Sequence, residues 1–559
     1  MTSAVPLGQA KLRLVAVLSC LVVLLLGMVP AASAHATLIG SDPTEGAVLD
    51  VAPERITFTF NESVIGVPSG TTVFDATGAE VASTSTVTGS QLFVDLGEEV
   101  GEGTLVVVWR LVSRDGHPIG GSLRFSVGGP SDVVDIPGAA AADVDAQPPV
   151  LLTAMRWLGY LGLLVGAGVA AFSVLFLPRE RAADAARGRL RRLVRAAVVV
   201  AAVGWWAAVP LVAIYQLGVP ASALADASTW AALAAWEYAV PSAVVVGLAL
   251  AAAQVPSAAA PGRRRAALVL AACALALAAP ALTGHTRAAS PEVLAIGADV
   301  LHLVAAAVWL GGLVSIVLVL GDLAARGDSG AVVIARFSAG AAWVLAVLVV
   351  VGLLQAWWIA GSVQALMDTS YGTVLLIKVI VALVAVAIGA WNRRVLLPRL
   401  RAATQRKDRQ ASASALVRAT AAEAAILVVV LLVTAVLVDR SPQAELTAAS
   451  EDQSSEVRQS VQLEAIAADI VLAPAAVGPN TLTIEMTDAS GAPAEGYETP
   501  RLSVSSPAVN LGEVVVRSRA PGVYSGDIVL PTNGEWTVHV SLRTSEFDNP
   551  VRTVQITVP

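Results

Sequence analysis

The stretch LHLVAAAVWLGGLVSIVLVL, residues 301–320, contains one ionisable side chain, that of His302. A bilayer core is crossed by about 20 apolar residues of α-helix, so this stretch has the length and composition of a membrane span. Similar apolar segments recur along the chain. They lie near residues 151–177, 193–217, 230–254, 265–284, 294–320, 339–361, 372–391 and 416–438. These segments predict a polytopic α-helical membrane bundle of about eight spans over residues 150–440.

The composition of the whole chain agrees with a membrane protein. Of the 559 residues, 56% are hydrophobic and 14% are charged, and the mean hydropathy is +0.71. A soluble chain of this length is less apolar. The net charge of −7 gives no sign of nucleic-acid binding, and the two cysteines, Cys20 and Cys273, supply no disulfide framework. Because the sequence has no nucleotide-binding motif, any transport is expected to be passive or ion-coupled.

Basic residues alternate between successive loops of the expected bundle. The arginine-rich loops are residues 179–195, 263–265, 326–336 and 393–409. The intervening loops hold almost no basic residues beyond Arg287. Because positive charge marks cytoplasmic loops, both ends of the bundle are expected to face outward. We therefore expect a plasma (inner) membrane protein whose N- and C-terminal domains are extracytoplasmic.

The first residues predict a secretion signal. A basic KLR triplet precedes an apolar run, and ASA at residues 32–34 has the small-residue pattern that signal peptidase cuts. The mature chain is therefore expected to begin with His35.

Alternating apolar and polar residues predict a β domain on each side of the bundle. ITFTF at residues 56–60 and LTIEM at residues 482–486 have the period of half-buried strands. Stretches rich in Gly, Ala, Pro or polar residues read as linkers. The expected division is a signal at 1–34, an all-β Greek-key sandwich or barrel at 35–128, a linker at 129–149, the bundle at 150–440, a linker at 441–460 and an immunoglobulin-like β-sandwich at 461–559.

Two histidines and an aspartate of the first domain form a candidate metal site. A free N-terminal His35 offers a metal its α-amine and its ring Nδ1 in one chelate ring. The next histidine, His117, lies in SRDGHPIGG, two residues after Asp115. In an extended segment such a pair projects from one face. An amine, two imidazoles and a carboxylate are ligands suited to tetragonal Cu(II).

A plainer interpretation of the same residues is that the cleavage position happens to leave His35 first and that residues 115–117 are a surface turn. A processed N-terminal histidine combined with Asp-x-His favours the metal site of His35, Asp115 and His117. Glu62 is either an indirect partner of that site or, more simply, a surface carboxylate.

The first domain resembles the periplasmic copper-binding family CopC. The similar stretches are HA at 35–36, SDP at 41–43, ITFTFNE at 56–62 and VSRDGHPIGG at 112–121. The resemblance implies that His35, Asp115 and His117 bind Cu(II). Some members also hold a methionine-rich Cu(I) site, but no methionine lies between Met28 and Met155 here.

The bundle resembles the membrane family CopD, and chains that fuse the two families are known. The similar stretches are LHL at 301–303, WLGGL at 309–313, YG at 371–372, LIK at 376–378, WNRR at 391–394 and Glu423. The resemblance implies copper import. The C-terminal domain faintly resembles a small exported domain attached to such proteins, and it implies no activity.

Ionisable residues in the expected spans suggest a route for the ion, because charge inside a bilayer is costly and usually paired or functional. Asp299 and His302 lie three apart, on one helical face. Lys378 falls at a similar depth, Glu423 lies deeper, and His285 lies at the outer mouth. The alternative is a set of interhelical hydrogen bonds with one Lys–Glu pair that only fixes the bundle.

Three functions fit these features. The first is copper acquisition, in which the outer site feeds the bundle. The second is a copper-dependent oxidative enzyme, although Asp115 would fill the open position that an oxygenase needs. The third is a haem electron-transfer protein, for which the spans and their edges offer only His285 and His302. We favour the first, a non-enzymatic protein whose expected partners are the copper ion and the bilayer, with no nucleic acid.

Overall fold

The computed structural model describes most of the chain in two compact units, Met1–Gln443 and Ala444–Pro559. The expected signal, His35 and His285 lie outside the described residues. The described residues are 36–97, 100–129, 131, 148–178, 180, 183–258, 260–284, 291–325, 329–360, 362–403, 405–438, 440, 456–476, 478–488, 490–506, 510–514, 516–530, 532–544 and 548–558.

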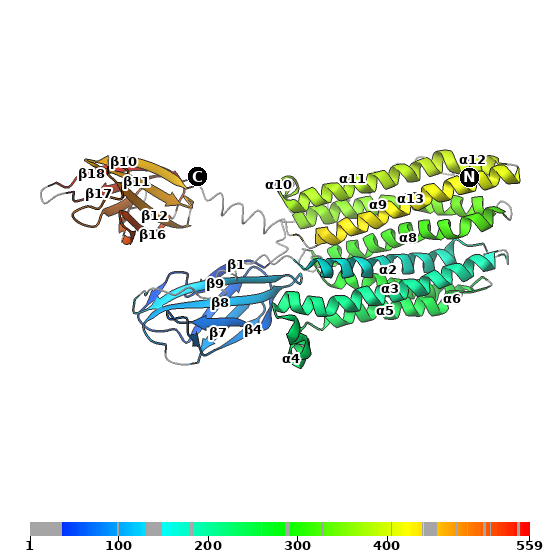
Figure 1. Ribbon diagram of the computed structural model, residues 1–559, viewed down its shortest axis with the longest axis horizontal. Helices are drawn as coiled ribbons and strands as arrows, with labels where there is room; N and C mark the ends of the chain where they lie inside the picture. The colour runs from blue at the N-terminus through cyan, green and yellow to red at the C-terminus, as the bar shows by residue number, and fades with distance from the viewer. Residues whose placement is uncertain are drawn as a thin grey trace, which may run out of the picture. The chain divides into compact units, whose positions relative to one another are not determined.

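The first domain is a β-sandwich, as its alternating pattern predicts (Figure 1). Its strands are β1 (Leu38–Asp42), β2 (Val48–Leu49), β3 (Arg55–Phe60), β4 (Val64–Phe74), β5 (Glu80–Val81), β6 (Ser83–Thr88), β7 (Gln91–Leu96), β8 (Gly103–Ser113) and β9 (Pro118–Val127). One sheet has the order β1-β3-β7-β6 and the other the order β2-β9-β8-β4-β5. All of these neighbours pair antiparallel except β2 and β9, which are parallel.

Aromatic side chains join the two sheets of the first domain. Ile56, Phe58 and Phe60 of β3 are buried, while the threonines between them are partly exposed. Trp109 of β8 packs against both phenylalanine rings, with centroids 6.1 Å from Phe58 and 5.2 Å from Phe60. Large aromatic side chains dominate the burial energy of a small core. This packing fixes β8, and with it the turn that follows β8.

The described residues contain eight helices long and apolar enough to cross a membrane, as predicted. They lie in α2 (Val150–Leu175), α3 (Asp184–Leu217), α5 (Trp236–Gln254), α6 (Arg263–Ala278), α8 (Glu292–Ala325), α9 (Ser329–Ala360), α11 (Ser370–Trp391) and α13 (Arg406–Val438). Shorter helices between them are η2 (Ala221–Ala225), α4 (Ala227–Ala232), η3 (Pro280–Leu282), α10 (Val363–Asp368), η4 (Asn392–Leu396) and α12 (Leu397–Ala402). Some helices, such as α3, begin before the expected apolar segment and include arginines of the preceding loop.

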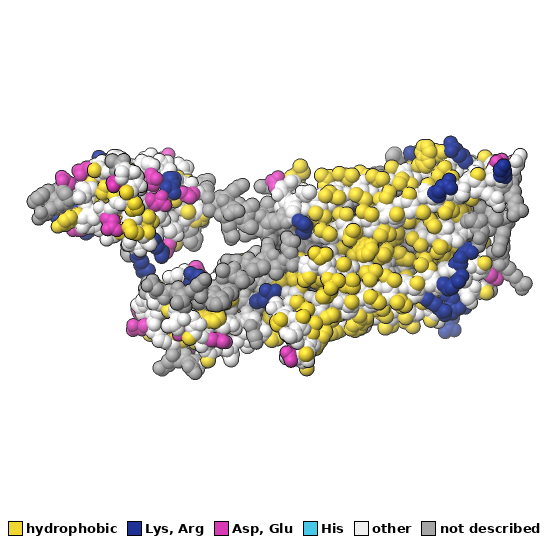
Figure 2. All heavy atoms as spheres, viewed as in Figure 1, with side chains coloured by type: hydrophobic (Ala, Val, Ile, Leu, Met, Phe, Trp, Pro, Cys, Tyr) yellow, Lys and Arg dark blue, Asp and Glu magenta, His cyan; other side chains and the backbone are white. Residues whose placement is uncertain are grey.

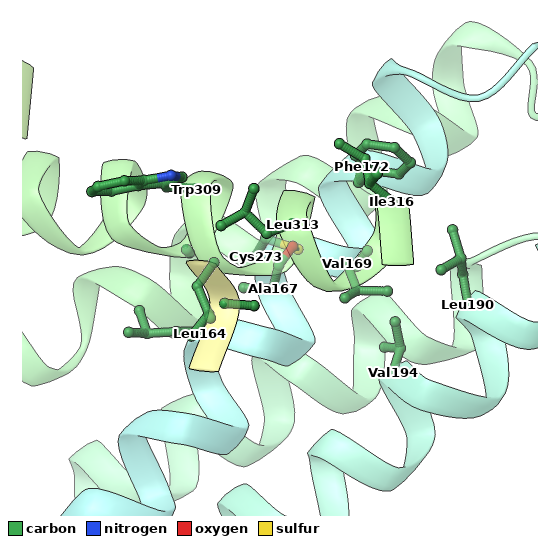
Figure 3. Close-up of a cluster of buried hydrophobic side chains, with 14 of the residues drawn as sticks. Leu164, Ala167, Val169, Phe172, Leu190, Val194, Cys273, Trp309, Leu313 and Ile316 are labelled. Atoms are coloured by element: carbon green, nitrogen blue, oxygen red, sulfur yellow. The ribbon is translucent and has the colours of Figure 1, made fainter. Parts of the chain in front are cut away.

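Small residues let α2 and α8 approach closely within the bundle. A Cβ added at Gly168 would overlap the Ala307 carbonyl, and one added at Gly311 would overlap the backbone of Gly168. Close backbone approach through small residues is how membrane helices gain packing energy without a hydrophobic driving force. Figure 3 shows the larger side chains around this contact, including Phe172 and Cys273.

The C-terminal unit consists of two β-sheets around one hydrophobic core. Its strands are β10 (Val457–Leu463), β11 (Ile466–Ala473), β12 (Gly478–Thr487), β13 (Arg501–Ser505), β14 (Asn510–Val514), β15 (Arg517–Ala520), β16 (Val523–Leu530), β17 (Gly534–Ser541) and β18 (Val551–Val558). The sheet orders are β10-β11-β12-β16-β15 and β14-β13-β17-β18.

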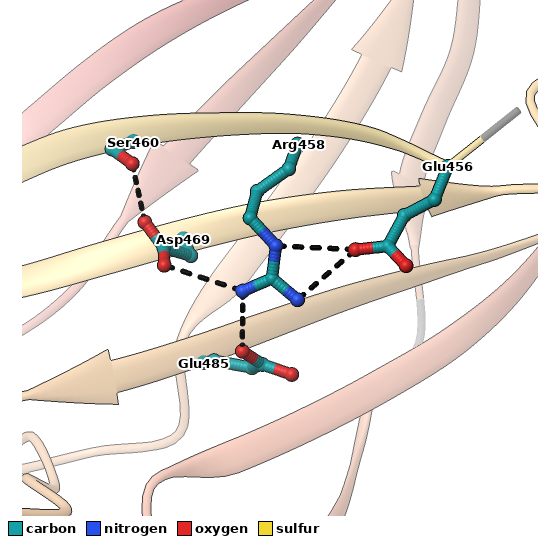
Figure 4. Close-up of polar contacts among 5 residues, drawn as sticks. All are labelled: Glu456, Arg458, Ser460, Asp469 and Glu485. Atoms are coloured by element: carbon teal, nitrogen blue, oxygen red, sulfur yellow. Dashed lines mark hydrogen bonds and ion pairs between the residues drawn. The ribbon is translucent and has the colours of Figure 1, made fainter.

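Strand β10 begins at Val457, inside the stretch 441–460 that the sequence suggests as a linker. Gln459 interrupts the alternation of apolar and polar residues in β10, so the strand was not recognised in the sequence. Arg458 pairs there with Glu456, Asp469 and Glu485, as Figure 4 shows. These carboxylates raise the pKa of the Arg458 guanidinium. Since exposed ion pairs contribute little to stability, the network is a surface feature of this sheet.

Candidate functional site

The candidate metal residues of the first domain lie in the turn between β8 and β9. The Ser113 N–H donates to the His117 carbonyl at 2.9 Å, and the Gly116 N–H donates to the Ser113 carbonyl at 3.0 Å. Gly116 has a φ of +92°, a conformation that residues with a Cβ rarely adopt. Glycine at this position therefore permits the tight return of the chain.

Asp115 and His117 face each other within this turn. His117 Nδ1 lies 3.2 Å from Asp115 Oδ2, and the His117 backbone N–H donates to Asp115 Oδ1 at 3.1 Å. The Asp115 side chain is fully buried, and that of His117 is 12% exposed. The expectation of an extended segment is wrong, because Gly116 bends the backbone. The two side chains nevertheless meet, which is what a shared metal requires.

The start of the domain is held beside the same turn. Ala36 is buried, and its N–H donates to the Ser113 hydroxyl at 3.2 Å. Ser113 is itself fully buried, at 0% exposure. The expected ligand His35 directly precedes Ala36 and lies outside the described residues.

Asn61 and Glu62, which follow β3, support this arrangement. The Thr37 N–H donates to Asn61 Oδ1 at 2.8 Å, and the Ser113 hydroxyl donates to Glu62 Oε1 at 2.6 Å. Burial raises the pKa of Glu62, and the hydrogen bond from Ser113 opposes that effect. The plainer expectation of an ordinary surface carboxylate at Glu62 is therefore wrong. The signals in the sequence were its place in the ITFTFNE stretch and its position two residues after a buried strand.

Within the described part of the chain, no group of three His, Cys, Asp or Glu side chains is arranged to hold a metal ion. Asp115 and His117 supply two candidate ligands. A third ligand from the chain start would complete the predicted set.

A second polar cluster lies inside the bundle and contains three of the predicted residues. Asp299 of α8 accepts a hydrogen bond from Gln355 Nε2 of α9 at 3.0 Å. Lys378 of α11 interacts electrostatically with both Asp299 and His302. His302 lies ten residues into α8, about 15 Å along the helix at 1.5 Å per residue. Gln355 carries no charge, and its position has no regular spacing from Asp299, so nothing in the sequence indicated this hydrogen bond.

Glu423 of α13 belongs to a separate cluster. It is 4% exposed, and its two carboxylate oxygens accept hydrogen bonds from the Trp309 indole and the Asn392 amide, each at 3.0 Å. Asn392 begins the π-helical turn η4, a distortion often found at functional positions. Among the described ion pairs, none joins Lys378 to Glu423, so the Lys–Glu pair considered from sequence does not form.

The helical bundle, residues 150–440, is called the membrane unit from here on. The first domain also contacts this membrane unit, at the C-terminal end of α3. Arg110 of β8 donates to the carbonyls of Tyr215 and Gln216, at 2.9 and 3.3 Å. The Gln216 amide donates to the Gly116 carbonyl at 3.1 Å. The His117 and Tyr215 rings are perpendicular, with centroids 6.5 Å apart. The candidate metal turn thus lies against the membrane unit.

Three family models match successive parts of the chain. The CopC domain matches residues 38–128. The Copper resistance protein D-like, N-terminal domain matches residues 144–292, and Copper resistance protein D matches residues 331–437. Together they cover the first domain and most of the membrane unit.

Several curated proteins are similar to this chain. Copper transport protein CutJ of Bacillus subtilis (strain 168) is 25% identical over 544 residues, 92% of this chain and 94% of that protein. Protein YobA of Escherichia coli (strain K12) is 34% identical over 105 residues, 18% of this chain and 82% of that protein. Copper resistance protein C of Xanthomonas campestris pv. juglandis is 32% identical over 105 residues, 17% of this chain and 82% of that protein.

Two solved structures are similar to part of the chain. The crystal structure of CopC from Methylosinus trichosporium OB3b has 24% identity and a TM-score of 0.16, covering 18% of this chain and all of that one. The methionine-rich copper resistance protein PcoC from Escherichia coli has 26% identity and a TM-score of 0.15, covering 17% of this chain and 98% of that one.

Proposed function

Because this chain belongs to the family of CopC–CopD fusion proteins, we propose that it takes up copper across the plasma membrane. In this proposal the first domain binds Cu(II) outside the cell through His35, Asp115 and His117. The membrane unit then carries the ion inward. The protein acts as a carrier and not as an enzyme, in keeping with relatives named for copper transport and resistance.

The observation that carries the proposal is the hydrogen bond from Ala36 to Ser113, beside the Asp115–His117 turn. Consecutive Cα atoms are about 3.8 Å apart, so a residue bonded to Ala36 starts within reach of that turn. Its free amine and imidazole would then meet the second imidazole and the carboxylate. Nitrogen-rich ligands with one carboxylate oxygen suit Cu(II), whereas a Cu(I) site would need thioethers.

The charge distribution supports the proposed orientation. Figure 2 shows hydrophobic side chains covering the helices on this face and Lys and Arg gathered at the end where α6 and α12 lie. Exposed arginines at that end include Arg263, Arg264, Arg399 and Arg401. Positive residues favour the cytoplasmic side. The ends where α2 begins and α13 finishes would then face outward, together with the first and C-terminal domains.

We further propose that Asp299, His302 and Lys378 form the outer part of the ion's route, with His285 at its mouth and Glu423 deeper. The hydrogen bond between α8 and α9, together with the nearby charge of Lys378 on α11, supports a functional cluster, since isolated charge in a bilayer is costly. An imidazole at this depth is a suitable copper ligand.

Copper titration of the first domain tests the outer site. The first domain with His35 as its free N-terminus should bind one Cu(II) with nitrogen-rich coordination. Adding one residue before His35 should strongly lower the Cu(II) affinity. Asp115→Ala should also weaken binding, whereas Asp95→Ala changes a surface carboxylate that pairs with Arg55 and serves as the matched control. Unchanged affinity in the extended form would refute this ligand set.

Copper accumulation in whole cells tests the direction of transport. Cells that make the protein should accumulate more copper than cells without it, with the largest difference at low external copper. Equal or lower accumulation would refute uptake. Titration of the first domain is independent of this result, so binding and transport can fail separately.

A further inference from the structure

The C-terminal end of α3 meets a cation of the first domain. The last carbonyls of an α-helix have no partner within the helix, and the end carries partial negative charge. Gly218 ends α3 in a left-handed conformation, and its N–H donates to Ile214. The carbonyls of Tyr215 and Gln216 instead receive hydrogen bonds from the Arg110 guanidinium. The first domain therefore caps a membrane helix.

Glycine at position 218 leaves space for the Arg110 guanidinium at the end of α3. A Cβ at Gly218 would lie 2.9 Å from Arg110 Nε, so a side chain there would displace the guanidinium. Val67 and Val112 of the first domain pack against Leu217 of α3. Arg114 adds an ion pair with Glu292 at the start of α8, at 2.9 Å. Apolar, helix-capping and ionic contacts thus act at one interface.

One side chain links the candidate metal turn to a carboxylate of the membrane unit. The Gln216 Nε2 donates to the Gly116 carbonyl and to Glu237 Oε1, each at 3.1 Å. Gly116 lies between Asp115 and His117. The Glu237 carboxylate, at the start of α5, is therefore held within two hydrogen bonds of the metal turn.

Polar groups continue from Glu237 into the bundle. Arg156 of α2 interacts electrostatically with both Glu237 and Tyr160. Tyr160 in turn interacts with Asp299, the carboxylate beside His302 and Lys378. Glu237, Arg156, Tyr160 and Asp299 therefore lie in succession within electrostatic range of one another, from α5 through α2 to α8.

We propose that the first domain is docked on the membrane unit through Arg110 and Gln216, and that copper passes directly from the Asp115–His117 turn to Glu237 without release into the outside solution. Arg110 and Gln216 are positioning residues, and Glu237 is the first acceptor. This inference rests on the proposed function. It adds that the ion, once bound, is protected from external competitors.

Copper uptake in the presence of a membrane-impermeant Cu(II) chelator tests the direct passage. The full-length protein is reconstituted in vesicles, and chelator is added at a concentration that removes free Cu(II) but not Cu(II) bound to the first domain. Wild-type uptake should persist, whereas Arg110→Ala should take up copper at least fivefold more slowly with chelator and near normally without it. Arg110→Lys, which keeps a cation at the helix end, should restore part of the resistance.

Three further variants control for damage to the fold and test the ion pair at the interface. Arg55→Ala removes an exposed arginine that pairs with Asp95, and it should behave as wild type. Arg114→Glu should make uptake chelator-sensitive, and adding Glu292→Arg should reverse that effect by re-forming the ion pair with opposite signs. Cu(II) affinity of the first domain should stay within about twofold in all of them.

The outcomes separate the two proposals. Equal chelator sensitivity of wild type and Arg110→Ala would overturn direct passage while leaving uptake intact. If copper uptake by Glu237→Gln persisted in the presence of chelator as it does in wild type, the role of Glu237 as acceptor would be overturned. Absence of wild-type uptake even without chelator would overturn the proposed function itself, and direct passage with it.

Discussion

The N–H of Ala36 and the hydroxyl of Ser113 lie 3.2 Å apart, although 77 residues separate them in the sequence. Ser113 is fully buried at the end of β8 and donates its own hydroxyl proton to Glu62. One serine therefore connects the start of the domain, the candidate metal turn and a half-buried carboxylate. Its contribution to metal binding is indirect, through the position of the chain start.

Ser113→Ala should weaken Cu(II) binding without removing a ligand. A typical hydrogen bond contributes about 0.5–1.5 kcal/mol net, and loss of this one frees the chain start. We expect a severalfold lower Cu(II) affinity and a lower melting temperature for the first domain, measured by titration and thermal unfolding. Ser85→Ala, at an exposed position on β6, should change neither. Equal affinities for the two variants would show that Ser113 does not position the site.

Reporter fusions should locate the ends of the spans. A fusion after Arg192 or Arg401 should be cytoplasmic, because each follows arginine-rich sequence at the basic end of the bundle. A fusion after Pro442 should be outside. A reporter active in the cytoplasm after Pro442 would contradict the proposed orientation and the even number of spans.

The main architecture was predictable because its signals are local. A run of about 20 apolar residues indicates each span. The alternation of apolar and polar residues in ITFTF at 56–60 likewise indicates the strand β3. The start of the C-terminal domain was placed too late, at 461, because Gln459 breaks the alternation of Val457 and Val461 with the polar residues of the edge strand β10.

Spacing in the sequence could pair only those candidate site residues that are near neighbours. Asp115 and His117 could be paired by spacing, but the turn geometry depends on Gly116. Contacts between distant segments left no periodic signal. The Gln355 bond to Asp299 and the Arg110 cap on α3 are of this kind, because the helices and strands must first pack to bring them together.

His302→Ala should lower copper accumulation while leaving Cu(II) binding by the first domain unchanged. The substitution removes the imidazole beside Asp299 and Lys378 from the proposed route. His539→Ala, at an exposed position on β17 of the C-terminal unit, is the matched control and should leave accumulation unchanged. Normal copper accumulation by His302→Ala protein present at wild-type levels would mean that His302 is structural.

Glu423→Ala should destabilise the bundle, because it leaves the Trp309 indole and the Asn392 amide without their buried acceptor. Each unsatisfied buried donor costs about 1–3 kcal/mol. Thermal unfolding in detergent should show a clear drop in melting temperature. The double variant Glu423→Ala/Trp309→Phe should be less destabilised than the sum of the single variants, because the donor and its acceptor are lost together. Additive effects would show that the indole hydrogen bond contributes nothing.

The C-terminal unit should lose stability in acid partly through Asp488. This carboxylate accepts hydrogen bonds from the Ser490 hydroxyl, the Ser490 N–H and the Ala492 N–H, which hold its pKa below the ordinary value. Because the folded pKa is lower than the unfolded one, its stabilisation is complete above the unfolded value of about 3.9 and is lost as pH falls through the folded pKa. An NMR titration of the Asp488 carboxyl should show the low pKa directly.

Asp488→Asn tests the effect of the carboxylate charge separately from the effect of the hydrogen bonds in the turn. The amide oxygen of Asn can accept the same backbone hydrogen bonds but does not titrate, so the turn should persist and its acid sensitivity should disappear. Melting temperatures of wild type and Asp488→Asn should therefore converge as pH falls below the folded pKa and separate above it. Parallel curves at all pH values would show that the ionised carboxylate adds no stability beyond that of a neutral acceptor.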